Sequence, residues 1–274
     1  MPGTLRLRVF AGPNGSGKSI MLKQVRETKV GGRPVDVGTY VNADEIARTL
    51  REKGTLSLDT YQVVASRSTL ARFATTTGLL NAQFTQHRFR TGQRYHKNTF
   101  ELKSKEYAEH FAQLLAAFLC DQLLKAKRKF SFETVFSHSS KLDLMRKAGK
   151  AGYKVYLYFV ATNSSELNID RIRTRVERGG HDVPRMKIIE RYGRSLQQLL
   201  PGIDLCYHAF VFDNSGEKPL MFAEMKKTAI GRAWAWSDKD IPDWFIREYL
   251  IASKDPIYLH VAEEVLKARS AKDE

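Results

Sequence analysis

Hydrophobic and polar positions along this chain follow two patterns, one typical of strands and one typical of helices. Short apolar runs typical of buried strands occur at residues 5–10, 39–42, 130–135, 154–161 and 208–212. Apolar residues recur every three or four positions, as on one side of a helix, at residues 18–28, 44–50, 142–148, 165–178 and 185–200. Strands that alternate with helices predict an α/β fold with a mostly parallel sheet, whose functional groups lie at the carboxyl ends of the strands.

Two regions depart from this alternation. Residues from about 57 to 124 have helical spacing and no obvious chemistry, which predicts a helical insert. The apolar positions that carry this spacing are Tyr107, Phe111, Leu114, Leu115 and Phe118. The tail from residue 233 holds all three tryptophans and a further helix, so we expect it to pack on the core. We predict one domain over residues 1–232, which contains the insert, and a C-terminal helical extension over 233–274.

Composition narrows the possible classes of protein. Of the 274 residues, 42% are hydrophobic and 27% are charged, as in ordinary globular proteins. The longest apolar run, Val155–Ala161, is too short to cross a bilayer, and no segment resembles a signal peptide, so we expect no membrane span. Cys120 and Cys206 lie far apart, which disfavours a disulfide framework or zinc site and favours the cytoplasm. The net charge of +15 predicts attraction to polyanions such as nucleotides or nucleic acids.

A glycine-rich segment follows the first predicted strand. It reads Gly12-Pro13-Asn14-Gly15-Ser16-Gly17-Lys18-Ser19 and fits the pattern G-x-x-x-x-G-K-[ST] between a strand and a helix. Glycines let such a loop wrap closely around a phosphate, and the helix that starts there adds its positive end. All eight residues are predicted to bind ATP, with Lys18 on the β- and γ-phosphates and the Ser19 hydroxyl on Mg²⁺. The loop also predicts a P-loop nucleotide-binding fold, a three-layer sandwich with helices on both faces of the sheet.

Two carboxylates lie near the ends of predicted strands. Asp44 lies where the second strand meets its helix, so it is either a general base or the residue that caps the helix. Glu133 is an isolated acid inside the apolar strand 130–135, where burial without a partner is costly. We expect it to meet a metal ion, a cation or a hydrogen-bond donor. That partner belongs either to the active site or to a buried structural pair.

A stripe of arginines runs along the predicted helix 165–178. Arg171, Arg175 and Arg178 are spaced i, i+4 and i+7, which places them on one side of the helix. Ile172 and Val176 lie about a quarter turn away and are expected to face the core. The stripe is either a solvated basic face or a lid that presents guanidinium groups to a triphosphate. We assign all three arginines to ATP binding and Arg175 to catalysis as well.

Four of these segments together resemble the zeta-toxin family of P-loop kinases: "AGPNGSGKS", "NADEIA", "FETVFS" and "RVERGGHDVP…RYGRSL". The resemblance covers about residues 5–59 and 125–216 and leaves out the insert and the tail. It implies that Asp44 is the general base for the acceptor hydroxyl and that Glu133 lies near substrate and metal. It also implies that Arg175 clamps the transferring phosphate. His181 stands about where some members carry a second arginine, and we expect it to position the lid or donate a hydrogen bond.

The resemblance implies an ATP- and Mg²⁺-dependent kinase that phosphorylates a hydroxyl of a nucleotide sugar such as UDP-N-acetylglucosamine and is silenced by a small antitoxin protein. The positive charge keeps two alternatives open: a polynucleotide or other nucleotide kinase, and a regulatory ATP-binding module that contacts nucleic acid. No apolar run that ends in Asp-Glu is present, which disfavours a motor ATPase. The turn "DNSG" at residues 213–216 is a further candidate, because its backbone groups could hold adenine.

Overall fold

The computed structural model describes residues 4–180, 182–237 and 241–273, so His181 lies outside the described residues. The chain divides into two compact units. Unit 1 consists of Met1–Asp36 and Thr134–Glu274, and unit 2 consists of Val37–Glu133. The P-loop segment and the arginine stripe belong to unit 1, whereas both candidate carboxylates belong to unit 2.

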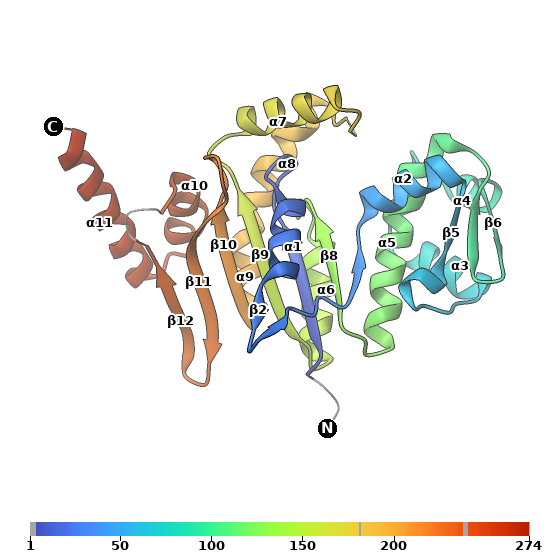
Figure 1. Cartoon of the computed structure of the whole chain (residues 1–274), viewed down its shortest axis with the longest axis horizontal. Coiled ribbons are helices and arrows are strands. Elements are labelled where there is room, and N and C mark those ends of the chain that lie inside the picture. Colours follow the sequence, from blue (N-terminus) through green and yellow to red (C-terminus); the bar gives the residue numbers. More distant parts are fainter. Residues whose placement is uncertain (1–3, 181, 238–240, 274) are drawn as a thin grey trace. The chain divides into compact units, whose positions relative to one another are not determined.

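Unit 1 is built on a sheet in which five strands follow the order β12-β11-β10-β9-β1 (Figure 1). The strands are β1 (Arg6–Ala11), β9 (Lys154–Ala161), β10 (His208–Asp213), β11 (Leu220–Thr228) and β12 (Gly231–Trp236). β1, β9 and β10 are parallel, and Leu157 lies opposite Val9 on one side and Ala209 on the other. The mostly parallel sheet is confirmed. The antiparallel β11–β12 hairpin was not predicted, although β11 begins with the apolar run Leu220–Ala223.

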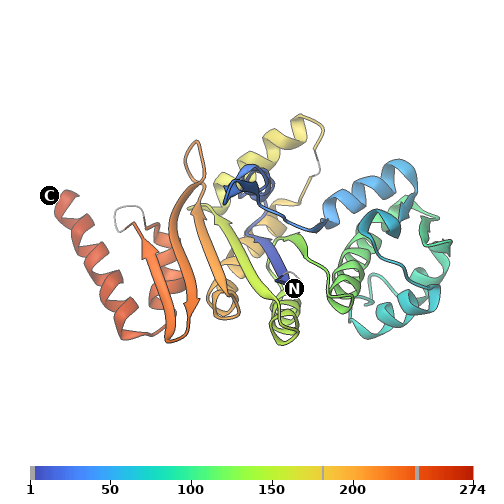
Figure 2. The same ribbon diagram turned by 60° about the horizontal axis from the view of Figure 1, so that its bottom comes forward.

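Helices cover both faces of this sheet. α1 packs against β1 and β9 on one face, and α6 and α9 lie on the other (Figures 1 and 2). The helices of unit 1 are α1 (Lys18–Glu27), α6 (Ser140–Lys150), α7 (Ser165–Glu177), α8 (Arg185–Gln197), α9 (Leu199–Asp204), α10 (Asp243–Phe245), the π-helical η3 (Ile246–Ile251) and α11 (Pro256–Asp273). Short strands β2 (Lys29–Val30) and β3 (Arg33–Pro34) follow α1. The helix–sheet–helix layering agrees with the predicted three-layer class.

Aromatic side chains anchor the C-terminal segment. Trp244, Phe245 and Tyr249 are fully buried, and Phe222 of β11 packs edge-on against both Trp244 and Phe245. The Trp244 Nε1 donates to Asp213 Oδ1 at 2.9 Å, which joins this segment to the carboxyl end of β10. Aromatic packing, with its large buried area, therefore holds the segment on the sheet.

Unit 2 contains a parallel strand pair, a helical pair and a small separate sheet. β4 (Thr39–Val41) pairs with β8 (Phe130–Thr134), and α2 (Ala43–Lys53) packs on α5 (Ala108–Lys125). The other elements are β5 (Thr55–Ser57), η1 (Leu58–Tyr61), α3 (Arg67–Thr76), α4 (Gln86–Thr91), β6 (Gln93–His96), β7 (Thr99–Leu102) and η2 (Lys105–Tyr107). The apolar positions of α5 are buried as expected.

The insert is not wholly helical, and the prediction was wrong on this point. β5, β7 and β6 form a three-stranded antiparallel sheet within it. The β6–β7 turn places Lys97 and Asn98 at positive φ angles of 45° and 58°, as tight hairpin turns require. Strands of three or four residues with mixed polarity give too short a signal to separate from helix. Among the described residues, no helix has the length and apolar character needed to cross a membrane.

Candidate functional site: a P-loop and two carboxylates

The glycines of the P-loop occupy backbone conformations that other residues rarely adopt. Gly17 has a φ of 96° and ends the loop, so that α1 begins at Lys18. Gly12 has a φ of 144°, and a Cβ atom added there would lie 1.9 Å from the carbonyl oxygen of Val160. Because only glycine fits these positions, the loop can turn tightly between β1 and α1.

Neighbouring elements hold the loop in this shape. The Asn214 Nδ2 donates to the Ser16 carbonyl at 2.8 Å, and Asn214 is buried. A Cβ on Gly17 would lie 2.3 Å from the same Asn214 nitrogen, and a Cβ on Gly15 would lie 2.8 Å from the carbonyl of Asn168 in α7. Asn214 belongs to the turn that was expected to hold adenine. Its side chain supports the P-loop, a role that sequence reasoning missed, while the expectation that the backbone of this turn holds adenine stays a prediction.

The loop has polar groups that suit a phosphate. Lys18 is 8% exposed, and its Nζ donates to the carbonyl of Pro13 at 2.8 Å. Within the described part of the chain, the buried Ser16 Oγ and Asn14 Oδ1 have no hydrogen-bond partner. A buried hydroxyl without a partner is costly unless a ligand satisfies it. The tight loop, the cation at its centre and the unsatisfied hydroxyl together fit a bound phosphate group.

A magnesium site would depend on the nucleotide as well as on the protein. Ser19 lies in the first turn of α1 and is exposed. The described residues contain no group of three or more His, Cys, Asp or Glu side chains placed to hold a metal ion. Magnesium commonly binds through one or two protein groups together with substrate phosphates, so Ser19 fits such a role. The assignment of Ser19 and Glu133 as metal ligands stays a prediction.

In unit 2, one side chain connects the two candidate carboxylate residues. The Asn42 Oδ1 accepts a hydrogen bond from the Asp44 backbone N–H at 2.8 Å, and thereby caps α2. Its Nδ2 donates to the Tyr40 hydroxyl at 2.9 Å and more weakly to Glu133 Oε2 at 3.4 Å. The Tyr40 hydroxyl in turn donates to Glu133 Oε2 at 2.9 Å. The network fixes the Glu133 carboxylate and the start of the helix that carries Asp44.

These contacts rule out the capping alternative for Asp44, whereas the role of Glu133 stays a prediction. Asn42, not Asp44, caps α2, so the capping alternative for Asp44 is wrong; Asp44 is exposed and its carboxylate is not needed for the cap. Glu133 is half-buried and accepts from neutral donors within its own unit. Burial raises the pKa of Tyr40, and the Glu133 charge raises it further, so Tyr40 remains a protonated donor. Sequence reasoning missed Tyr40 and Asn42.

The arginine stripe lies on α7 and at its end. Arg171 is half-buried and donates from Nη2 to the Gly216 carbonyl at 3.2 Å, whereas Arg175 and Arg178 are exposed. Ile172 packs with Val183 and Ile188, and Val176 joins this cluster, so the predicted apolar side is confirmed. Lys18, Ser19 and the arginines belong to unit 1, and Asp44 and Glu133 belong to unit 2. Their convergence on one phosphate stays a prediction.

Comparisons with known proteins show similarity to one family over part of the chain. The model of the family described as Zeta toxin matches residues 83–217, just under half of the chain. An uncharacterized protein of Haemophilus influenzae is 33% identical over 63 residues, which are 23% of this chain and 45% of that protein. A crystal structure of AvrRxo1-ORF1 and -ORF2 with ATP has a TM-score of 0.50 and 13% identity, and the likeness covers 82% of this chain and 59% of that chain.

A second structure, of AvrRxo1-ORF1 and AvrRxo1-ORF2 with sulphate ions, has a TM-score of 0.50 and 12% identity over 97% of this chain and 77% of that chain. At such low identity the two structures show a shared fold alone. The chain spans less than two thirds of both the Haemophilus protein and the ATP-containing structure that it matches.

The resemblance to the zeta-toxin family of P-loop kinases is confirmed over residues 83–217, which match the model of that family. The match includes residues 83–124, so the expectation that the family resemblance leaves out the insert was wrong. It does not extend to residues 5–59, where the resemblance stays a prediction. The family match over residues 83–217 and the α/β fold are the basis of the kinase proposal below.

Proposed function

We propose that this protein is an ATP-dependent kinase that transfers the γ-phosphate to a hydroxyl of a small molecule, with a nucleotide sugar such as UDP-N-acetylglucosamine as the favoured acceptor. The observation that carries this proposal is the P-loop, in which a nearly buried Lys18 and an unsatisfied buried Ser16 hydroxyl lie inside a tight glycine turn. The AvrRxo1 structure with ATP, which shares the fold, supports the choice of the same nucleotide here.

Each candidate residue has a distinct task in this proposal. Lys18 leaves the Pro13 carbonyl to contact the β- and γ-phosphates, and the Ser19 hydroxyl holds Mg²⁺. When bound, Mg²⁺ neutralises phosphate charge. Asp44 orients the acceptor hydroxyl and accepts its proton, which adds typically about 10² to 10⁴ in rate. Glu133, fixed by Tyr40, lies near the acceptor and the metal, and Arg175 compensates charge on the transferred phosphate.

The acceptor is the finer part of the proposal. A nucleotide sugar follows from the family resemblance, while the net charge of +15 favours a polynucleotide as the second candidate. We also propose that a small antitoxin protein silences the activity, as in the family that the chain resembles. The cytoplasm is the proposed location, because both described cysteines are free and buried as in reduced proteins.

The test is a transfer assay with γ-labelled ATP and a panel of acceptors that includes UDP-sugars, NAD and oligonucleotides. We expect label on a UDP-sugar in the presence of Mg²⁺, and none with the Lys18→Ala variant, because that variant loses its hold on the γ-phosphate. Label on oligonucleotides instead would favour the second candidate acceptor, a polynucleotide. ATP hydrolysis without transfer to any member of the panel would contradict the kinase proposal.

A further inference from the structure

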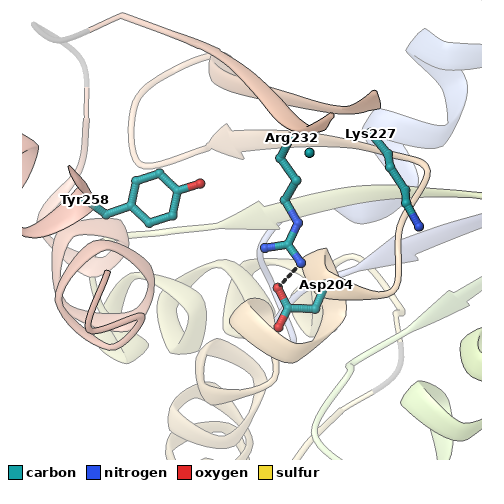
Figure 3. Close-up of a pocket in the computed structure, with 5 residues that line it drawn as sticks. Asp204, Lys227, Arg232 and Tyr258 are labelled. Carbon is teal, nitrogen blue, oxygen red and sulfur yellow. Dashed lines mark ion pairs between the residues drawn. The ribbon is translucent and has the colours of Figure 1, made fainter. Parts of the chain in front are cut away.

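A pocket lies in unit 1 at the opposite end of the sheet from the P-loop. The P-loop follows the carboxyl end of β1, whereas this pocket lies where β11 and β12 pass the amino end of the parallel strand β10. Its volume is about 400 Å³, and the residues that line it are Asp204, Lys227, Gly231, Arg232 and Tyr258 (Figure 3). Volumes of roughly 300–1,000 Å³ are usual for sites that bind small molecules.

The register of the hairpin explains the charge of this pocket. Residues two apart on a strand share a face, so the cross-strand pairs Ala223–Trp236, Met225–Trp234 and Lys227–Arg232 form successive rows on one face. Met225 is fully buried and Ala223 nearly so. The last row therefore places two exposed cations directly opposite each other at the end of this face. Like charges in such a pair are destabilising unless an anion lies between them.

The protein supplies only one anion for these two cations. Asp204, at the end of α9, forms an ion pair with Arg232 at 2.9 Å. Figure 3 shows Lys227 on the side of Arg232 opposite Tyr258, away from the Arg232–Asp204 ion pair. In the described ranges, Lys227 has no side-chain ion pair or hydrogen bond. One positive charge is therefore uncompensated at this pocket.

The Tyr258 hydroxyl completes the polar lining. Tyr258 accepts a hydrogen bond from Trp234 Nε1 at 2.9 Å, so its own proton remains available, and Figure 3 shows its hydroxyl directed towards Arg232. Tyr249 behind it is fully buried, and its hydroxyl has no hydrogen-bond partner of good geometry among the described residues. Burial raises the pKa of Tyr249, and the neighbouring Tyr258 raises it further, so the Tyr249 phenol stays protonated near neutral pH.

We propose that this pocket is a second anion-binding site, separate from the P-loop, that takes a small-molecule oxyanion through Lys227, Arg232 and Tyr258. Two cations and a hydroxyl donor that line one pocket suit a phosphate or a carboxylate group, because charge-assisted hydrogen bonds to such groups are the strong ones. Because Asp204 compensates the charge of Arg232, a single positive charge remains, which favours a small ligand of modest charge over a long polyanion.

The test is a titration of the full chain with inorganic phosphate and, separately, with citrate, followed by tryptophan fluorescence. Trp234 and Trp236 report on the pocket because their rings lie 6.3 and 6.1 Å from that of Tyr258. We expect the Lys227→Ala variant to bind the anion about tenfold more weakly, as the loss of one charge-assisted hydrogen bond implies. Binding of phosphate, citrate or both supports the site and identifies which oxyanion it takes.

Lys226→Ala is the matched control. Lys226 carries the same charge on the same strand but points to the opposite face, so the variant changes net charge equally and spares the pocket. Binding of phosphate at the P-loop is common to both variants. Equal weakening by Lys226→Ala and Lys227→Ala would overturn the proposal in favour of diffuse attraction, as would the absence of a fluorescence response to both probes. Tyr258→Phe, with its melting temperature recorded, should also weaken binding; unchanged affinity would remove the tyrosine from the site.

Discussion

At the scale of single residues, Asn42 connects the backbone of Asp44 to the carboxylate of Glu133. Its side-chain oxygen caps α2, and its amide nitrogen donates to Tyr40 and Glu133. One amide therefore serves both a helix terminus and a candidate catalytic acid. Its contribution to stability and its contribution to activity can be separated by experiment, because other helices of the same unit have simple caps.

We expect Asn42→Ala to lower both stability and activity. Loss of the cap should reduce the free energy of unfolding by about 1 kcal/mol, measured in urea. The rate of phosphate transfer should fall as well, because Glu133 loses its supporting donor. The control is Ser66→Ala, which removes the cap of α3, where Ser66 Oγ accepts only from the local Thr69 backbone and nearby hydroxyls. It should cost similar stability and leave the rate unchanged; equal rates in the two variants would remove Asn42 from the site.

Sequence reasoning located some of these residues and missed others for a physical reason. Lys18 and Asp44 lie in local motifs, so their spacing alone marks them. Tyr40 bonds to Glu133 across 93 positions, and Asn214 bonds to Ser16 across 198. Such partners meet only after the strands pair, so no local pattern reveals them. Glu133 was noticed because an acid in an apolar strand needs a partner, but the pattern did not show that the partner is a tyrosine.

At the scale of elements, the P-loop depends on contacts with strands and turns far from it in sequence. Gly12, Gly15 and Gly17 contact β9, α7 and the turn after β10, respectively. Neighbouring elements therefore hold the loop in place on several sides. A methyl group introduced on its glycines should disturb phosphate binding without any loss of charge.

We expect Gly12→Ala to raise the dissociation constant for ATP by more than about tenfold, a change of ~1.4 kcal/mol. Its Cβ would lie 1.9 Å from the Val160 carbonyl, and its φ of 144° suits only glycine. Isothermal titration calorimetry measures the constant. Gly193→Ala in α8 is the control, since its Cβ would meet nothing within 4 Å, and it should leave ATP binding unchanged while it raises stability by up to about 1 kcal/mol. Normal ATP binding by Gly12→Ala would show that the loop is not the nucleotide-binding site.

Periodicity predicted the elements that are long and regular. The strand at 154–161 is found as Lys154–Ala161, and the helix 165–178 as Ser165–Glu177. The sheet of the insert and the β11–β12 hairpin were missed. The strands of the insert are short. In the hairpin, a lysine and two tryptophans share one face with smaller apolar residues, which weakens the alternation of apolar and polar positions. Turn geometry and cross-strand pairing set these elements, and neither has a strong local signal.

At the scale of the whole molecule, the candidate nucleotide-binding loop and the candidate acid–base residues belong to different compact units. Unit 1 holds the P-loop and the arginine helix, and unit 2 holds Asp44 and Glu133. A division of this kind predicts that ATP can bind without catalysis. It also implies that a ligand at the P-loop protects some parts of the chain and not others.

We expect ATP with Mg²⁺ to slow amide hydrogen exchange in residues 12–19 and to leave the β6–β7 hairpin, residues 93–102, unchanged. Backbone N–H groups of the loop bond to phosphate when it is bound, whereas the hairpin belongs to the other unit. Hydrogen exchange followed by mass spectrometry resolves both segments. Equal protection of the two segments would indicate a general stabilisation, and no protection of residues 12–19 would place the nucleotide elsewhere.

The proposal that Asp44 is the general base is tested with the Asp44→Asn variant. ATP affinity and the rate of phosphate transfer to the acceptor found in the panel are measured for this variant and for the native protein. Asparagine keeps the shape of the side chain and cannot accept the proton of the acceptor hydroxyl. We expect the rate of phosphate transfer to fall by a factor of about 10² to 10⁴ while ATP affinity changes little. Transfer at the native rate in Asp44→Asn would contradict the proposal.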